Sequence, residues 1–517
     1  MRTYPTLNIP SLDTIIDSSP SPYSLSPHAY DIDPTALALS PKIREECGVF
    51  GVYGAKNAAA ITALGLHALQ HRGQEACGIA ATNGKSFHSE RHVGLVGDNF
   101  TGSDPSLRLP GYAAIGHNRY STAGSNALRN IQPLYADFSS GGFALAHNGH
   151  LTNAYDLREK LVKDGAIFQS TSDTEVVLHM VARSKRVNFI DKFVDAIRQV
   201  DGGFAFIGLT NKTLIGARDR LGIRPLVIGK KDNMYVLASE TCALDMIDAE
   251  FFREVEPGEV VIIHEGGIEF IRAFPEVPSR PCVFEFVYFA RPDSIVGGKS
   301  VYEVRKRMGQ RLAQEAPADI DLIIPVPDSG VPAALGYAQE SKIQFDLGII
   351  RNHYVGRTFI QPTQQIRDMG VRLKHSANRK LIEGKKVLLV DDSIVRGTTS
   401  TKIVRMIRDA GATEVHFRSA SPMIKHPDFY GVDMPSTKSL LAANHDLETM
   451  NQLLGSDSLG FLSIEGLYWA LGLDVRNAEI PQFSDHCFTG EYPTALVDFE
   501  RKSQGKDPQM SFLVEVA

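Results

Sequence analysis

One stretch of this 517-residue chain constrains its fold more than any other: KKVLLVDDSIVRGTTSTKIVRMIRDAG, residues 385–411. Its continuous apolar run, residues 387–390, is typical of a central strand that is covered on both faces of a parallel sheet. The run ends at Asp391 and Asp392, a short polar loop follows, and apolar residues then recur at helical spacing until Gly411. The stretch therefore predicts a strand, a polar loop and a helix of an α/β domain.

The polar loop has the chemistry of a phosphate site. In α/β sheets, ligands lie beyond the carboxyl ends of the strands, where a helix N-terminus offers unpaired N–H groups to an anion. Gly397 lets the backbone approach the anion closely, and Thr398 and Thr399 add hydroxyl donors. The carboxylates of Asp391 and Asp392 suit ribose hydroxyls or a hydrated magnesium ion. The loop therefore predicts a site for a phosphorylated sugar, whereas a lone acidic pair would equally fit a solvated turn.

The segment VLLVDDSIVRGTTS, residues 387–400, resembles the phosphoribosyl-pyrophosphate (PRPP) signature of the type I phosphoribosyltransferases, in the form found in the glutamine PRPP amidotransferase family. A second segment, DLIIPVPDSG at residues 321–330, resembles the pyrophosphate loop of that family. The resemblance implies an α/β parallel-sheet domain with a magnesium ion held by Ser329, Asp391 and Asp392. The implied PRPP-binding residues are Asp328, Ser329, Asp391, Asp392, Ser393, Arg396, Gly397, Thr398 and Thr399.

The N-terminal part of the chain carries a second set of motifs. They are HALQHRGQEACGIA, IGHNRYSTAGSN, LAHNGHLTN and TSDTEV, at residues 67–80, 115–126, 145–153 and 171–176. Together with the strand-like EECGVFGVYG around Cys47, they resemble the glutaminase domain of the class II amidotransferases. This resemblance implies an α+β N-terminal-nucleophile fold, in which two stacked antiparallel sheets lie between helices. It also implies that Cys47 is the nucleophile and the first residue of the mature enzyme.

A terminal position suits a cysteine nucleophile for a chemical reason. The unperturbed pKa is about 8.5 for a thiol and about 7.7 to 8.0 for an α-amine, so a free terminal amine can act as the base. An amide nitrogen at Cys47 is not basic, so residues 1–46 must be removed first. These residues are rich in Ser and Pro and lack a sustained periodicity. We therefore predict that they are a disordered propeptide.

The same resemblance implies roles for the other glutaminase residues. The tetrahedral oxyanion needs about two donors, which would be the side chain of Asn148 and the N–H of Gly149. The guanidinium of Arg72 would bind the α-carboxylate of glutamine, and Asp173 would bind its α-ammonium group. The remaining residues implied for this pocket are Asn118 and Arg119.

Composition and charge exclude several other classes of protein. The chain has 54 basic and 60 acidic residues, a net charge of −6 and no dense basic block, so it gives no support to nucleic-acid or anionic-membrane binding. No apolar run approaches the roughly 18 residues of a membrane span, and we expect a cytoplasmic protein. Five unevenly spaced cysteines do not indicate a disulfide framework, and Cys77 and Cys242 are expected in the core.

The motifs also suggest a domain organisation. We expect a propeptide at residues 1–46, a glutaminase domain at 47–275, a phosphoribosyltransferase domain at 276–460 and a helical tail at 461–517. The helical segments from 436 onward are expected to pack over the synthase domain and its neighbours. Within the second domain, PCVFEFVYFARPDS at 281–294 predicts an apolar strand at the junction. The basic segment 351–380 resembles the loop that closes over bound PRPP.

One branch of the family holds a structural iron–sulfur cluster with four cysteines. Cys282 and Cys487 match two of those positions, whereas Asp428 and Ser484 stand at the other two. Four thiolates are the usual requirement for such a cluster. The sequence therefore predicts that this chain has no iron–sulfur cluster.

Together the two resemblances imply a reaction. Ammonia released from glutamine at Cys47 would pass to the second site and displace pyrophosphate from PRPP, giving 5-phosphoribosylamine, the first committed step of purine synthesis. They also imply a homo-oligomer, a tetramer, that purine nucleotides inhibit. The PRPP signature at 387–400 excludes the sugar-phosphate-aminating and asparagine-forming relatives. Two alternatives remain: a regulator that binds PRPP without catalysis, and a transferase that uses free ammonia.

Overall fold

The computed structural model describes residues 47–100, 104–120, 128–351, 375–432, 434 and 436–503. The predicted propeptide, residues 1–46, lies outside these residues, and so does most of the predicted basic loop, residues 352–374. The described part of the chain begins at Cys47.

Two antiparallel sheets form the first half of the described chain. The first sheet has the strand order β11-β9-β10-β1-β4-β2-β3 and the second has the order β13-β12-β8-β7-β6-β5. The first sheet contains β1 (Gly48–Tyr53), β2 (Ala76–Thr82), β3 (Phe87–Val93), β4 (Ala113–Arg119), β9 (Val227–Lys231), β10 (Met234–Ala238) and β11 (Glu250–Glu254). The second contains β5 (Leu134–Phe138), β6 (Gly141–Leu151), β7 (Gly202–Thr210), β8 (Leu214–Arg218), β12 (Glu259–His264) and β13 (Gly267–Arg272).

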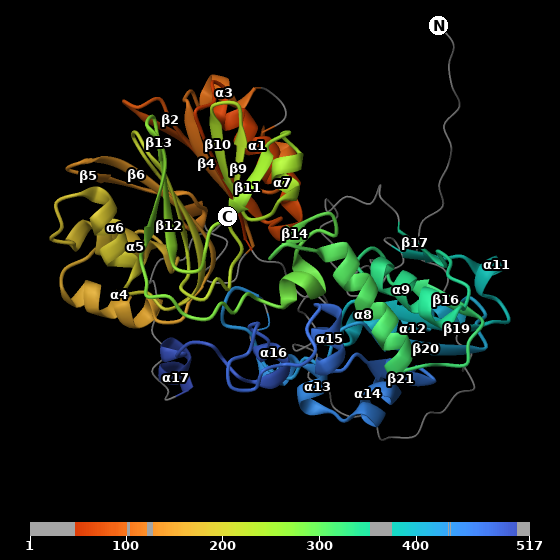
Figure 1. The fold of residues 1–517 in the computed structure, drawn as a ribbon. Helices are drawn as coiled ribbons and strands as arrows, with labels where there is room; N and C mark the ends of the chain where they lie inside the picture. The colour runs from red at the N-terminus through yellow and green to blue at the C-terminus, as the bar shows by residue number, and fades with distance from the viewer. Residues whose placement is uncertain are drawn as a thin grey trace, which may run out of the picture. The chain divides into compact units, whose positions relative to one another are not determined.

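Helices cover the outer face of each sheet, so the layers follow the order α–β–β–α (Figure 1). On the first sheet lie α1 (Ala58–Ala68) and α7 (Cys242–Asp245), and on the second lie α4 (Ala154–Lys163), α5 (Thr174–Arg183) and α6 (Phe189–Ile197). Shorter helices are η1 (Gln70–Arg72), α2 (Val96–Phe100), α3 (Pro105–Arg108) and η2 (Leu128–Asn130). Cys77 and Cys242 are buried in the core beneath α1 and α7, as predicted.

Gly51 of β1 lies where the two sheets pack closely against each other. Val49, Ile115 and Ile207 belong to one apolar cluster between the sheets. A Cβ atom on Gly51 would lie 2.9 Å from the Cγ2 of Ile207 on the facing sheet, so a side chain does not fit there. This close stacking brings the ends of β1, β4 and β6 together, and these strands carry the predicted glutaminase residues.

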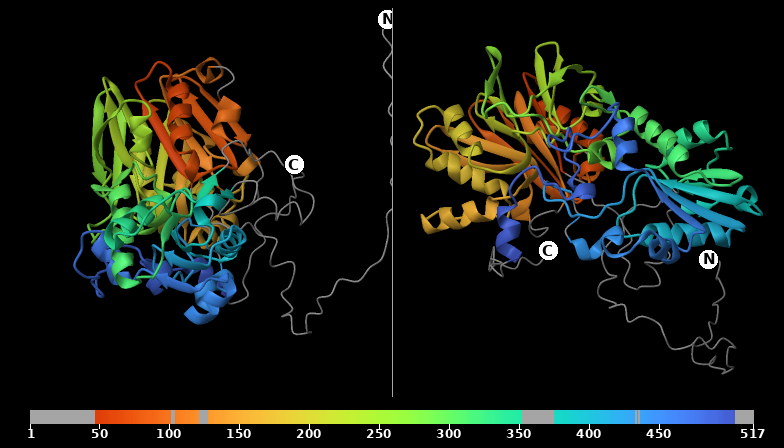
Figure 2. Two further views of the ribbon diagram at one scale, coloured as in Figure 1. Left: turned by 90° about the vertical axis from the view of Figure 1, so that its right-hand side faces the viewer. Right: turned by 60° about the horizontal axis from the view of Figure 1, so that its bottom comes forward.

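A four-stranded parallel sheet forms the centre of the second half, with the order β16-β19-β20-β21 (Figure 2). Its strands are β16 (Leu322–Pro325), β19 (Lys386–Asp391), β20 (Glu414–Ser419) and β21 (Ser458–Phe461). Leu388 and Val390 of β19 face the cluster that includes α8 and α9, while Val387 and Leu389 face the cluster around α12. Because both faces of β19 are covered, its apolar run is continuous, and the predicted strand, loop and helix are confirmed.

The remaining elements of the second half are short strands and helices. The strands are β14 (Ile295–Val296), β15 (Lys299–Ser300), β17 (Ile349–Arg351) and β18 (His375–Ala377). The helices are η3 (Glu285–Phe289), α8 (Val301–Glu315), α9 (Val331–Ser341), α11 (Arg379–Ile382), α12 (Thr398–Asp409), η4 (Thr437–Ser439), α13 (Leu441–Asn444), α14 (Leu447–Leu454), α15 (Ile464–Ala470), α16 (His486–Thr489) and α17 (Val497–Ser503).

One feature differs from the sequence prediction. The apolar segment 281–294 was expected to be a strand, but its centre is η3, a turn of π-helix that is buried on most sides.

The C-terminal helices pack against both halves. Helix α15 packs against α8, whereas α17 lies against α4 of the first half (Figure 1). There Asp498 accepts hydrogen bonds from the N–H groups of Tyr155 and Asp156 at the start of α4.

None of the helices in the described ranges is long and apolar enough to cross a membrane.

Helices α8 and α9 make the closest helix contact of the second half, and two glycines permit it. A Cβ atom on Gly309 would lie 1.8 Å from the carbonyl oxygen of Ala333, and one on Gly336 would lie 1.8 Å from that of Lys306. These backbones are in contact without side chains between them. The substitution Gly309→Ala must therefore push the two helices apart.

We predict that Gly309→Ala lowers the free energy of unfolding by about 1–3 kcal/mol or more, the usual cost of overpacking. Equilibrium denaturation followed by circular dichroism measures this change. The matched control is Gln339→Ala, at an exposed position of α9, which should change stability by less than about 0.5 kcal/mol. Equal stability of Gly309→Ala and the wild-type protein would contradict the close helix packing.

Candidate active sites

Cys47 lies at the start of β1, partly buried, between the ends of neighbouring elements. Its Sγ is 3.6 Å from the carbonyl oxygen of Tyr120, to which it can donate a hydrogen bond. The strand register pairs Gly48 with Asn118 of β4, so Asn118 and Arg119 lie beside the nucleophile. The structure therefore brings Cys47 together with the GHNRY motif, as the sequence implied.

Burial raises the pKa of the Cys47 thiol to about 11. The hydrogen bond to Tyr120 and the positive charges of Arg119 and Arg72 lower this pKa, and the charge of Asp173 raises it. Burial dominates, so the thiol is protonated at neutral pH while Cys47 is joined to residue 46. Activation of this thiol needs a base.

Arg72 is completely buried and is held by three groups of the protein. Its Nη1 donates to Glu240 at 2.6 Å and to Glu285 at 2.9 Å, and its Nη2 donates to Glu285 at 2.8 Å. Its Nε donates to the carbonyl oxygen of Cys47 at 3.3 Å. This guanidinium is engaged by two carboxylates of the chain itself, so its geometry favours a role in holding the backbone of Cys47.

Arg119 is a second cation close to the Cys47 thiol. It follows Asn118 at the end of β4, and its charge acts more strongly on the Cys47 thiol than the charge of Arg72 does. The Asn118 side chain donates to the carbonyl oxygen of Leu66 at 2.6 Å, which fixes the end of the strand. Arg119, at the end of β4, is therefore a second candidate, besides Arg72, for binding the α-carboxylate of glutamine.

Asn148 and Gly149 lie on β6, in the second sheet. The neighbouring residue His147 accepts at its carbonyl oxygen a hydrogen bond from His117 of β4, at 3.1 Å, and this bond ties the two sheets together beside the site. Both polar atoms of the Asn148 amide are buried, and neither has a hydrogen-bond partner among the described residues. A buried amide without a partner costs free energy unless a ligand pairs with it. This arrangement suits a donor to a substrate oxygen.

Asp173 lies at the N-terminus of α5 and points toward the same region. Its carboxylate accepts hydrogen bonds from the N–H of Thr174 at 2.8 Å and the N–H of Leu151 at 3.1 Å. Burial alone would raise the pKa of Asp173, but His147, His150 and the Leu151 N–H together hold that pKa below its ordinary value. Asp173 is therefore a carboxylate at neutral pH, as a partner for an ammonium group must be.

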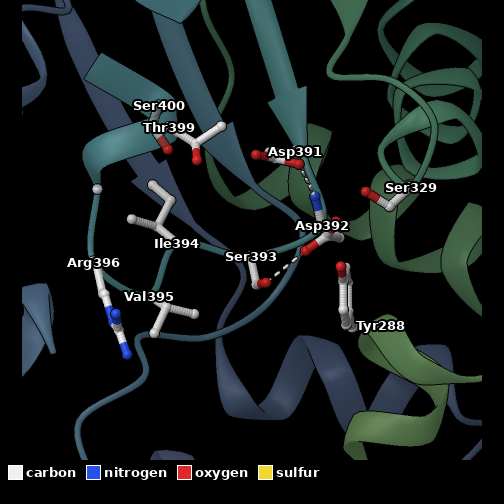
Figure 3. Close-up of a pocket in the computed structure, with 11 residues that line it drawn as sticks. Tyr288, Ser329, Asp391, Asp392, Ser393, Ile394, Val395, Arg396, Thr399 and Ser400 are labelled. Carbon is white, nitrogen blue, oxygen red and sulfur yellow. Dashed lines mark hydrogen bonds between the residues drawn. The ribbon is translucent and has the colours of Figure 1, made fainter. Parts of the chain in front are cut away.

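A pocket lies at the carboxyl ends of β16 and β19 in the second half (Figure 3). Of the nine residues predicted to bind PRPP, the following line it: Ser329, Asp391, Asp392, Ser393, Arg396, Gly397 and Thr399. Asp328 instead forms an ion pair with Arg351, and the hydroxyl of Thr398 is buried without a partner among the described residues. Four lining residues were not predicted: Tyr288, Ile394, Val395 and Ser400.

The loop between β19 and α12 is shaped by its acidic pair and its glycine. The N–H of Asp392 donates to the carboxylate of Asp391 at 3.0 Å, and the hydroxyl of Ser393 donates to that of Asp392 at 2.5 Å (Figure 3). Gly397 begins α12 with a φ of +74°, a conformation that favours glycine. The start of α12 thus opens toward the pocket, where it can bind an anion.

The donor set of this pocket fits a magnesium ion. Ser329, Asp391 and Asp392 offer a hydroxyl and two carboxylates, all of them oxygen ligands, which magnesium prefers. In Figure 3 the side chains of Asp391 and Ser329 lie on opposite sides of Asp392. The three residues that the sequence assigned to the metal therefore line one pocket.

The four positions that correspond to the cluster ligands also meet in space. Cys282 pairs with Ser484 in a short β-bridge, and Asp428 and Cys487 lie within the same buried group as His486. Asp428 and His486 share a hydrogen bond of 2.8 Å, and burial raises the pKa of Cys282 to about 11. Two thiols, with a carboxylate and a hydroxyl at the other two positions, do not supply the four thiolates that such a cluster usually requires.

Two sites and two folds define the class of this protein: a glutamine amidotransferase domain joined to a phosphoribosyltransferase domain. The family model of the glutamine amidotransferase domain matches residues 117–246, and that of the phosphoribosyl transferase domain matches residues 297–421.

Relatives that match over nearly their whole length show to which family within this class the chain belongs. The amidophosphoribosyltransferase of Rhizobium etli is 60% identical over 90% of this chain and 96% of its own length, and that of Bacillus subtilis is 46% identical over 89% and 96%. A solved structure of glutamine PRPP amidotransferase from B. subtilis, complexed with ADP and GMP, matches with a TM-score of 0.82 and 45% identity, over 87% of this chain and 98% of that chain. The chain belongs to the amidophosphoribosyltransferase family.

The raised pKa of Cys47 leads to a prediction about alkylation. In protein that retains residues 1–46, on the order of a thousandth of the thiol is ionised at pH 8, so iodoacetamide should modify Cys47 slowly, with a rate that rises toward pH 11. Removal of those residues supplies a free amine, and the rate at pH 8 should rise at least tenfold. Peptide mass spectrometry measures both rates.

Cys487 serves as an internal control, since its side chain is buried and its rate should not depend on processing. Equal alkylation of Cys47 in both forms would show that the amine does not activate the thiol.

Proposed function

We propose that this protein is an amidophosphoribosyltransferase, which transfers ammonia from glutamine to PRPP and yields 5-phosphoribosylamine, glutamate and pyrophosphate. This is the first committed step of purine synthesis. The observation that carries the proposal is that one chain has Cys47 beside the GHNRY motif and, in its second half, a pocket lined by Asp391 and Asp392. Full-length relatives of the same family support it.

In the glutaminase half, Cys47 is the nucleophile. Its sulfur forms a bond to the amide carbon of glutamine, ammonia leaves, and water then hydrolyses the thioester to glutamate. The α-amine of Cys47, exposed by removal of the propeptide 1–46, accepts the thiol proton and passes it to the leaving ammonia. Asn148 and the N–H of Gly149 stabilise the oxyanion, and the unpartnered amide of Asn148 supports this assignment.

The two charged ends of glutamine need one cation and one anion. Asp173, kept ionised by its neighbours, binds the α-ammonium group. We assign the α-carboxylate to Arg119, because the guanidinium of Arg72, the residue that the sequence suggested, is already engaged by Glu240 and Glu285. Arg72 then acts by fixing the backbone of Cys47.

In the second half, the anion pocket binds PRPP. The phosphates lie against Ser393, Gly397 and Thr399 at the start of α12, where N–H groups and hydroxyls converge. Ser329, Asp391 and Asp392 would hold a magnesium ion, which, when bound, draws charge from the departing pyrophosphate. Ammonia attacks C1 of the ribose as the bond from C1 to the pyrophosphate oxygen breaks. Asp328, Arg396 and Thr398 complete the proposed PRPP-binding set.

Several further properties belong to the proposal. The domain limits are 47–275 and 276–460, with a helical tail at 461–517. The assembly is a homotetramer that purine nucleotides inhibit. The B. subtilis relative, solved in complex with ADP and GMP, supports the binding of nucleotides. An iron–sulfur cluster is not part of the proposal, because Asp428 and Ser484 replace two thiolates. A cytoplasmic location stays a prediction from the composition.

The reaction itself provides the direct test. Processed protein with magnesium should release pyrophosphate only when both glutamine and PRPP are present. Cys47→Ala should abolish the glutamine-dependent rate and retain the ammonia-dependent rate. A non-catalytic regulator would show neither rate, and a transferase that uses free ammonia would be unaffected by Cys47→Ala.

The two arginines can be separated by one comparison. Loss of a charge-assisted hydrogen bond of about 1.5–3 kcal/mol should make Arg119→Ala raise KM for glutamine by about tenfold to a hundredfold, with the ammonia-dependent rate unchanged. Arg72→Ala should instead lower the free energy of unfolding by about 3–5 kcal/mol, since it removes the buried guanidinium that pairs with two buried carboxylates. A stable Arg72→Ala protein with a raised KM would restore Arg72 as the carboxylate ligand.

A further inference from the structure

The loop at residues 428–432, which follows β20 in the second half, reaches across to the glutaminase half. A Cβ atom on Gly431 would lie 3.1 Å from the Cα and 3.3 Å from the carbonyl carbon of Gly149. A Cβ atom on Gly203, the neighbour of Gly149 in the sheet, would lie 3.1 Å from the Cβ of Tyr430. The backbone of this loop therefore covers the segment of β6 that carries the proposed oxyanion donors.

Gly149 is enclosed on its other sides as well. It has a φ of +131°, and a Cβ atom there would lie 2.0 Å from the carbonyl oxygen of Gly203 and 3.1 Å from the Cγ of Arg224. Gly149 thus lies between β7, the buried side chain of Arg224 and the backbone of Gly431. A displacement of loop 428–432 would open the one side of this enclosure that does not belong to the glutaminase half.

Asp428 sets the conformation of the loop. Its Oδ1 accepts hydrogen bonds from the N–H of Tyr430 at 2.7 Å and the N–H of Val432 at 2.9 Å. Its Oδ2 is 2.8 Å from Nε2 of His486, whose Nδ1 is 2.9 Å from the hydroxyl of Ser484. Burial raises the pKa of Asp428, but the hydrogen bond and charge of His486 outweigh this and hold the pKa below its ordinary value. The carboxylate is therefore charged and can hold both N–H groups.

The order Ser484–His486–Asp428 has the connectivity of a hydrolase triad. All three side chains are buried, with relative exposures of 1%, 1% and 5%. No substrate can reach a hydroxyl that is enclosed in this way. The group is therefore a means of fixing the backbone, and the backbone that it fixes is the one against Gly149.

We propose that Asp428 is a positioning residue of the glutaminase reaction, which acts through loop 428–432 to hold Gly149 in the geometry of the oxyanion hole. The proposal rests on the function proposed above. It assigns a role in the first site to a residue of the second half, at one of the positions where a branch of the family has a cluster ligand. A shift of about 1 Å at an oxyanion donor is enough to reduce the rate by a large factor.

The substitution Gly431→Ala tests the contact, and the chain offers a closely matched control. Gly431 and Gly267 have φ values of +124° and +123°, so alanine meets the same backbone strain at both. A Cβ atom at Gly267 has no atom within 4 Å, whereas one at Gly431 meets Gly149. The rates to be measured on processed protein are the glutamine-dependent and the ammonia-dependent release of pyrophosphate.

We expect Gly431→Ala to lower the glutamine-dependent kcat at least tenfold and to change the ammonia-dependent rate less than twofold, with Gly267→Ala near wild type in both. Equal losses of the two rates in Gly431→Ala would show a general structural role and overturn the proposal. The proposal would also be overturned if the ratio of the glutamine-dependent to the ammonia-dependent rate were the same in Gly431→Ala and Gly267→Ala. Absence of glutamine-dependent activity in the wild-type protein would instead refute the proposed function itself.

A second pair of variants tests Asp428 directly. Asp428→Ala removes the acceptor of both N–H groups and should lower the same ratio of rates at least tenfold. Asp428→Asn keeps an oxygen for these groups and an amide for His486, and should restore the ratio to within about threefold of wild type. Failure of Asp428→Asn to restore it, in a protein whose ammonia-dependent rate is intact, would contradict the proposed role. If Asp428→Ala does not fold, the rates of Gly431→Ala decide whether the proposed role of the loop is correct.

Discussion

The buried guanidinium of Arg72 joins the first half to the junction between the halves, and the position of the nucleophile depends on it. Two carboxylates hold it: Glu240 follows the end of β10 in the first half, and Glu285 begins η3 at the junction. Removal of one partner from such a group leaves an uncompensated buried charge, at a cost of about 3–5 kcal/mol. Since Arg72 also holds the carbonyl of Cys47, the geometry of the nucleophile depends on the junction.

The same junction extends to the second site. Within one turn of π-helix, Glu285 contacts Arg72 and Tyr288 lines the anion pocket. Arg305 of α8 holds this turn through the carbonyl oxygens of Phe286 and Ala290, at 2.7 and 2.8 Å. A π-helical turn is a common feature of functional sites, and here it lies between two of them. The two centres are therefore connected by a short, rigid piece of backbone.

Local patterns of the sequence predicted many of the strands and helices of this molecule. They did not reveal the contacts between residues that lie far apart in the chain. The strand, loop and helix around Asp391 followed from an apolar run and a helical period, because both are local properties of the chain. Tyr288 was missed, because a short apolar run does not distinguish a strand from a buried helix. The ion pairs of Arg72 join residues 168 and 213 positions apart, so no motif could reveal them. The resemblance of the motifs to known families did imply that Arg119 lies near Cys47 and that Ser329 lies near Asp392.

The contact between α17 and α4 has a consequence for biosynthesis. The first N–H groups of α4, just beyond the strand that carries Asn148, find their acceptor in Asp498, 343 residues later. Proteins emerge from the ribosome N-terminal end first, and domains fold as they emerge. Here the ammonia-producing half lacks the cap of one helix until nearly all of the ammonia-accepting half has been translated. The order of synthesis thus delays completion of the ammonia-producing half until the ammonia-accepting half has been made.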